Sequence, residues 1–224
     1  MTTHLAMAPP SIRQAAQTAR HVPSRPVRRR PGWRRFGWMP LAPAAVTLAV
    51  MLSGITSSSY WGDETATISA VSRPLPRLIA MLGHVDVVHG LYYLLIWPIA
   101  QVAGTSELVM RLPSAVAMAA AALGIAAIGR RLSSPLAGLL AGLAFAAEPV
   151  VSLWGQDARP YAMTVAAAVL ASWLLLPVLE RPGAARLAAY AASVALLGYL
   201  SLTCLLLVAA HAVTVGRAWR TAPD

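Results

Sequence analysis

The sequence predicts an all-α integral membrane protein built as a polytopic bundle of helices. Hydrophobic residues make up 58% of the 224 positions and charged residues only 12%, and several apolar runs approach the roughly 20 residues that a spanning helix needs. The 18 basic residues are all Arg and outnumber the 8 acidic ones; eight of these Arg fall within residues 1–37, which contain no acid. The positive-inside rule explains this asymmetry. We therefore expect a lipid bilayer, and no nucleic acid, as a partner.

The chain divides into a polar tail and an apolar domain. Residues 1–37 are rich in Pro and Arg and lack apolar periodicity, so we predict a disordered cytoplasmic tail. Residues 38–224 form the predicted transmembrane domain. Its first spanning helix runs from Trp38 to about Thr56, which leaves residues 58–111 as an external loop. The predicted location is the cell membrane, with a cytoplasmic N-terminus and an active face outside the cytoplasm.

The charged loops decide whether residues 88–103 span the bilayer or lie in its interface. If they do not span, four later Arg residues lie in the cytoplasm; if they span, all four move outside, against the positive-inside rule. We therefore predict the non-spanning alternative, with amphipathic surface helices in the external loop. Residues 187–216 remain either one long helix or a hairpin. The four deciding residues are Arg130, Arg131, Arg181 and Arg186.

Two adjacent carboxylates, Asp63 and Glu64, follow the first apolar run and are the first acids in the chain. One interpretation is structural, since acids in the first turn cap and stabilise a surface helix. The other is functional, because ionisable groups at a membrane face are expensive and usually serve a site. The predicted topology gathers on the outer face Asp63, Glu64, His84, Asp86, His89, Arg111, Asp157 and Arg159.

Each of these residues also has a plainer interpretation. His84 and His89 are then ordinary loop residues, Arg111 anchors a helix end, and Arg159 pairs with Asp157. Two acids and two His could also bind a divalent metal, but their spacing fits no compact metal motif. We therefore predict no cofactor and keep a divalent metal as the alternative.

Four motifs in a fixed order carry a family resemblance. They are Trp61-Gly62-Asp63-Glu64, His89-Gly90-Leu91-Tyr92-Tyr93, the segment from Gly104 to Ala115 with Arg-Leu-Pro-Ser-Ala, and the segment from Trp154 to Tyr161. From about residue 38 onward, the chain resembles bacterial membrane glycosyltransferases of the C-type superfold. These are related to protein O-mannosyltransferases and to the lipid A aminoarabinose transferase.

The resemblance implies a donor, a reaction and a role for each site residue. A mannose-like sugar on a polyprenyl phosphate would move, with inversion, to a hydroxyl of a glycan, lipid or protein acceptor. Asp63, with Glu64 beside it, would be the catalytic base, and Arg111 and Arg159 would hold the donor phosphate. The remaining residues would orient sugar hydroxyls or these Arg. They are Glu64, Asp157, His84 and His89, with Tyr161 in the same donor-binding set.

Two departures leave an alternative open. Gly90 follows His89 where the family usually has proline, and family members are usually longer. The alternative is a truncated non-catalytic membrane protein, or a half-enzyme that a partner polypeptide completes. A transporter fits less well, because the predicted spans are nearly free of charge apart from Glu148.

Overall fold

The computed structural model describes residues 38–220, so the predicted tail, residues 1–37, lies outside the described residues. All regular structure in residues 38–220 is helical. The elements are α2 (Leu41–Leu52), α3 (Gly62–Val71), α4 (Leu75–Leu82), the 3₁₀ helix η1 (Val87–His89), α5 (Gly90–Ala103), α6 (Glu107–Leu132), α7 (Pro135–Ala147), α8 (Pro149–Gly155), α9 (Tyr161–Glu180), α10 (Ala184–Leu200), the 3₁₀ helix η2 (Leu202–Leu205) and α11 (Leu206–Arg220).

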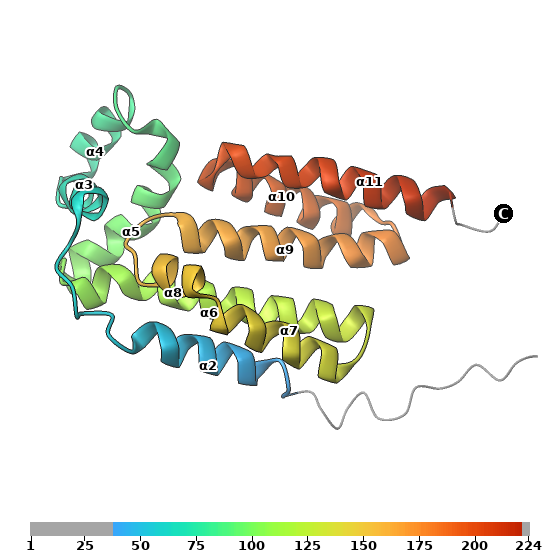
Figure 1. The fold of residues 1–224 in the computed structure, drawn as a ribbon. Coiled ribbons are helices and arrows are strands. Elements are labelled where there is room, and N and C mark those ends of the chain that lie inside the picture. Colours follow the sequence, from blue (N-terminus) through green and yellow to red (C-terminus); the bar gives the residue numbers. More distant parts are fainter. Residues whose placement is uncertain (1–37, 221–224) are drawn as a thin grey trace, which may run out of the picture. The chain divides into compact units, whose positions relative to one another are not determined.

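The long helices form a bundle in which α6 is central (Figure 1). Helix α6 packs against α2, α7 and α9, and α9 packs in turn against α10 and α11. Helices α6 and α9 and the run 202–220 are long and apolar enough to cross a membrane, and the number rises to four if the bent pair α7 and α8 is one span. Helices α2 and α10 are shorter apolar helices of the same bundle. The predicted fold class, a helical membrane protein, is confirmed.

The first helix is shorter than predicted, and the structure decides between the two alternatives for residues 187–216. The first helix ends at Leu52 rather than near Thr56, because the chain turns over residues 53–58. The segment 187–216 is a hairpin, in which η2 separates α10 from α11.

A bend of 67° separates α7 from α8, and its cause is Pro149. Proline disfavours helical backbone in the residue before it, and Glu148 accordingly has an extended conformation with ψ of 122°. Helix α8 then restarts with Pro149 at its first position, where a missing N–H costs nothing. The bend directs α8 toward the loop of residues 156–160.

Glycine allows the close helix contacts that position this loop. A Cβ on Gly138 of α7 would clash with the Ala126 carbonyl of α6, so small residues let these two backbones approach, as is common in membrane bundles. A Cβ on Gly155, at the end of α8, would clash with Met51 of α2 and Met118 of α6. Loop 156–160 therefore begins tightly against both helices.

Helices α3, α4 and α5 lie together at one end of the bundle, and α5 runs across that end rather than along the bundle (Figure 1). Tyr92, Tyr93 and Ile96 of α5 are fully buried. The indole N–H of Trp97 donates to the Arg73 carbonyl at 2.9 Å, which fixes α5 to the connection between α3 and α4. This arrangement fits the non-spanning alternative for residues 88–103.

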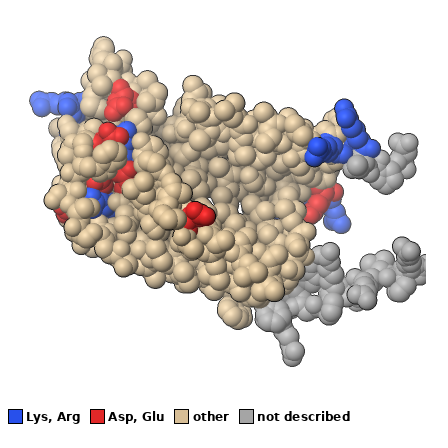
Figure 2. All heavy atoms as spheres, viewed as in Figure 1, with Lys and Arg blue, Asp and Glu red and all other residues tan. Residues whose placement is uncertain are grey.

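Charged side chains gather at the two ends of the helix bundle that the described residues form (Figure 2). According to the helix bounds, five acids lie at the end that holds α3, α4 and α5: Asp63, Glu64, Asp86, Glu107 and Asp157. Six basic residues lie at the opposite end: Arg130, Arg131, Arg181, Arg186, Arg217 and Arg220.

Cysteine labelling tests this arrangement. Ser133 and Val87 are both exposed, and they lie at opposite ends of the bundle. In a Cys204→Ser background, we expect a membrane-impermeant thiol reagent to label Val87→Cys in intact cells, and to label Ser133→Cys only after permeabilisation. Labelling of both variants in intact cells would instead mean that α5 crosses the membrane.

Candidate functional site

The site end of the molecule is built on a buried ion pair between Glu64 of α3 and Arg111 of α6. Their exposures are 0% and 2%. The Arg111 guanidinium donates from Nε to Glu64 Oε1 at 2.8 Å and from Nη2 to Oε2 at 2.6 Å, the bidentate geometry that makes such pairs strong. Burial alone would raise the pKa of Glu64, but Arg111 and the backbone N–H groups of Ala158 and Trp61 hold it below its ordinary value.

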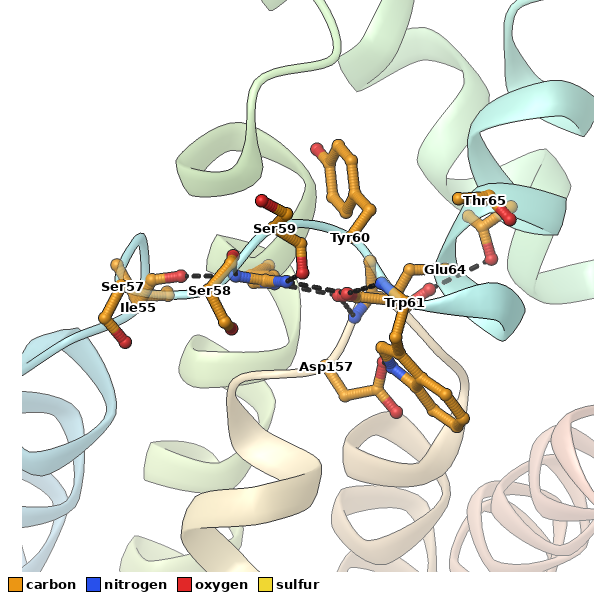
Figure 3. Close-up of polar contacts among 12 residues, drawn as sticks. Ile55, Ser57, Ser58, Ser59, Tyr60, Trp61, Glu64, Thr65 and Asp157 are labelled. Atoms are coloured by element: carbon orange, nitrogen blue, oxygen red, sulfur yellow. Dashed lines mark hydrogen bonds and ion pairs between the residues drawn. The ribbon is translucent and has the colours of Figure 1, made fainter.

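Arg111 uses its other donors to hold the chain that leads from α2 to α3 (Figure 3). Nη1 donates to the carbonyls of Ile55 and Ser58 at 2.8 and 2.9 Å, and Nη2 donates to the Ser59 carbonyl at 3.4 Å. All five N–H groups thus have an acceptor within the protein. These contacts show a structural role for Arg111, and the phosphate-binding role predicted from the sequence stays a prediction.

Loop 156–160 ties the end of α2 to the start of α3. The Gln156 side chain donates to the carbonyls of Met51 and Ser53 at 2.8 and 2.9 Å, which satisfies carbonyls that a helix end leaves without partners. The backbone N–H of Ala158 donates to Glu64 Oε1 at 2.9 Å. The loop therefore depends on the same buried carboxylate as α6.

Asp157 of this loop is 4% exposed and faces Trp61 (Figure 3). Its Oδ1 accepts the indole N–H at 3.2 Å, and its backbone carbonyl accepts from the Ser114 hydroxyl at 2.6 Å. Burial raises the pKa of Asp157 to about 6. The alternative pairing with Arg159 is not seen: no hydrogen bond or ion pair joins the two side chains in the described residues.

Arg159 lies just before α9 and is only 7% exposed, yet the hydrogen bonds that its N–H groups donate are long. Nη1 reaches the Asp63 carbonyl and the Tyr93 hydroxyl, both at 3.4 Å. Nη2 reaches His89 Nε2 at 3.2 Å, and the buried Nε has no hydrogen-bond partner among the residues that the structure describes. Arg111 makes contacts as short as 2.6 Å, so Arg159 is the cation that could rearrange around a ligand.

Asp63 adjoins Glu64 but lies in a different environment. Its side chain is 50% exposed, and Oδ2 is 4.0 Å from Arg159 Nη2. Its carboxylate accepts no hydrogen bond from the residues that the structure describes. The site thus offers an accessible carboxylate beside a loosely held guanidinium.

A second group of contacts surrounds Arg159 and comes from η1 and α5. Asp86 Oδ1 lies 2.8 Å from His89 Nδ1, and Asp86 Oδ2 accepts the Tyr93 hydroxyl at 2.6 Å. Burial would raise the pKa of Asp86, but these two hydrogen bonds lower it. No role had been predicted for Asp86 or Tyr93. Their spacing around His89 would place the three residues on one face of a continuous helix, but Asp86 precedes the helix and has a left-handed backbone.

The remaining predicted residues are placed differently. His84 is exposed, and its side chain makes no hydrogen bond, ion pair or ring contact within the described part of the chain. The Tyr161 ring packs on Trp154 with centroids 4.2 Å apart, and the Tyr161 side chain also interacts with Arg159. Within residues 38–220, no three His, Cys, Asp or Glu side chains come together as ligands of a metal ion.

Comparison with known families gives one match. The family model described as dolichyl-phosphate-mannose-protein mannosyltransferase matches residues 90–221, more than half of the chain. The matched segment contains Arg111, Asp157 and Arg159 and begins after Asp63 and Glu64. Neither the curated proteins nor the solved structures give a match. The chain belongs to the dolichyl-phosphate-mannose-protein mannosyltransferase family, as its resemblance to membrane glycosyltransferases predicted.

Proposed function

We propose that this protein moves a mannose-like sugar from a polyprenyl-phosphate donor to an acceptor hydroxyl at the outer face of the cell membrane, with inversion. The family supports sugar transfer of the mannosyltransferase type. One observation carries the proposal: the exposed Asp63 carboxylate lies 4.0 Å from the Arg159 guanidinium. A single site therefore offers a base for a hydroxyl and a cation for a phosphate.

The reaction would divide between these two residues. Asp63 takes the proton of the acceptor hydroxyl while the hydroxyl oxygen attacks the anomeric carbon. The bond from that carbon to the phosphate oxygen breaks, and its electron pair leaves with the polyprenyl phosphate. Arg159 donates to the phosphate as its negative charge grows. Attack opposite the leaving group gives inversion.

The buried residues would position these two. Glu64 and Arg111 fix the start of α3, on which Asp63 lies, and Ala158 carries the same restraint into the loop that bears Arg159. Asp157 holds the Trp61 indole beside Asp63. We therefore assign Glu64, Arg111 and Asp157 positioning roles, in place of direct contact with the donor.

An apolar groove supports a lipid-linked donor. It has a volume of about 710 Å³ and lies between α6 and α9, with Leu95 of α5 and Leu200 of α10 among its lining residues. Met163, in the first turn of α9, also lines it, so the groove begins close to Arg159 along the chain. A polyprenyl tail would lie in the groove while its phosphate reaches Arg159.

The distribution of Arg supports an outward-facing site. The six Arg residues at the opposite end of the bundle would mark the cytoplasmic side by the positive-inside rule. The acceptor would then be a glycan, lipid or protein outside the cytoplasm.

Replacing Asp63 by Asn tests the base. Asn keeps the size of the side chain but cannot take the proton, so transfer should fall by about 10²–10⁴-fold. The measurement is transfer of radiolabelled mannose from saturating polyprenyl-phosphate mannose in membranes that contain the native acceptors. Glu148→Gln, which removes an exposed acid at the α7–α8 bend, is the control and should keep the wild-type rate. An Asp63→Asn variant with full turnover would reduce Asp63 to a helix-capping residue.

Replacing Arg159 tests phosphate recognition. Lys keeps the charge but loses the planar fork, so Arg159→Lys should weaken donor binding, and Arg159→Ala should weaken it by about 10- to 100-fold. Binding is measured with the polyprenyl-phosphate sugar and with a neutral, phosphate-free analogue. Arg77→Lys changes an exposed Arg of α4 and should have no effect. Equal wild-type affinity for both ligands, unchanged in Arg159→Ala, would rule out the phosphate contact.

A further inference from the structure

The contact between Arg159 and His89 fixes the protonation state of the imidazole. Every guanidinium nitrogen is a hydrogen-bond donor and none is an acceptor. His89 Nε2, which lies 3.2 Å from Arg159 Nη2, must therefore accept with its lone pair. The imidazole proton is then on Nδ1, which lies 2.8 Å from Asp86 Oδ1 and donates to it. Both contacts are satisfied together only by a neutral imidazole in this tautomer, which is an assignment from the hydrogen-bond network.

The same contacts close into a ring of hydrogen bonds. Asp86 Oδ2 accepts from the Tyr93 hydroxyl, and that hydroxyl accepts from Arg159 Nη1 at 3.4 Å. Asp86 itself has a left-handed backbone with φ of 61°. This conformation is uncommon for residues other than glycine, and residues held in it are often found at functional sites.

We propose that Asp86 and His89 are a positioning pair that holds Arg159 ready for the donor phosphate only while His89 is neutral, so that donor binding weakens when the site is acidified. The proposal rests on the proposed function, because it takes Arg159 as the phosphate ligand. It adds a regulatory property that phosphate binding by Arg159 does not by itself require.

Protonation of His89 would reverse the contact. A proton on Nε2 would face a donor of Arg159, and two cations would lie 3.2 Å apart, where an accepted hydrogen bond now exists. An ordinary histidine titrates near pH 6.5, within the physiological range. The charged or titratable groups that face His89 and Arg159 are Asp86 of the loop before η1, Tyr93 of α5, Asp63 of α3, Tyr161 of α9 and Asp157 of loop 156–160.

The experiment is equilibrium binding of a mannosyl polyprenyl phosphodiester to the full chain in detergent, between about pH 8 and pH 5. A phosphodiester keeps one negative charge over this range, so the probe itself does not titrate. The wild-type dissociation constant should rise by about tenfold or more on acidification. Circular dichroism at each pH checks that the helices remain folded.

Three variants test whether Asp86 and His89 cause the pH dependence of donor binding. His89→Gln supplies a permanent amide oxygen for Arg159 and an amide N–H for Asp86, so the dissociation constant of this variant should no longer depend on pH. Asp86→Asn removes the negative charge and leaves one acceptor for the two donors Nδ1–H and Tyr93 O–H, so it should bind more weakly than the wild type near pH 8. His84→Gln, an exposed histidine of the same loop, should keep the wild-type pH dependence.

Two results would overturn the positioning pair. They are wild-type affinity that stays constant or rises on acidification, and a pH dependence that persists in His89→Gln. Either result, with tight binding that still depends on Arg159, leaves the proposed function standing. No binding by the wild type at any pH would contradict the positioning pair and the proposed function together.

Discussion

The ion pair between Glu64 and Arg111 is the interaction on which the site end of the molecule depends. A buried carboxylate is unfavourable by several kcal/mol unless its charge and lone pairs are satisfied. Here Glu64 accepts from Arg111, from Ala158 and from the backbone of Trp61. The remaining N–H groups of Arg111 donate to backbone carbonyls of the chain between α2 and α3. One pair therefore joins two helices and two loops that are distant in sequence.

The pair also explains why two residues of the same charge differ in exposure or in hydrogen bonding. Asp63 and Glu64 are adjacent in α3, yet Glu64 is fully buried and Asp63 is half exposed. Arg111 and Arg159 are both buried, but every N–H donor of Arg111 has an acceptor, whereas Arg159 Nε has no partner among residues 38–220. In each case one member maintains the structure and the other is available to a ligand. A site that binds a charged lipid needs both, because a cation free to bind phosphate must itself be positioned.

The fold could largely be predicted from the sequence because its signals are local. Apolar run length gives the helices, and the Arg-rich ends favour one placement of α5 over the other. The side-chain partners could not be predicted, because they depend on long-range packing. Trp61 and Asp157 are far apart in the chain and meet only because α8 bends at Pro149. The ring around Arg159 includes Asp86, whose left-handed backbone interrupts the helical pattern that would have linked it to His89 and Tyr93.

A double-mutant cycle on Glu64 and Arg111, read as the free energy of unfolding in detergent, tests the central claim most directly. Glu64→Gln and Arg111→Met should each destabilise the protein strongly, because each leaves a buried charge without its partner. The double variant should cost less than the sum, with a coupling of about 0.5–3 kcal/mol. The exposed pair Arg131 and Glu180, with a similar N–O distance of 2.7 Å, is the control and should show little coupling. Additive effects at Glu64 and Arg111 would contradict the account, because the site end would then be held together by other contacts.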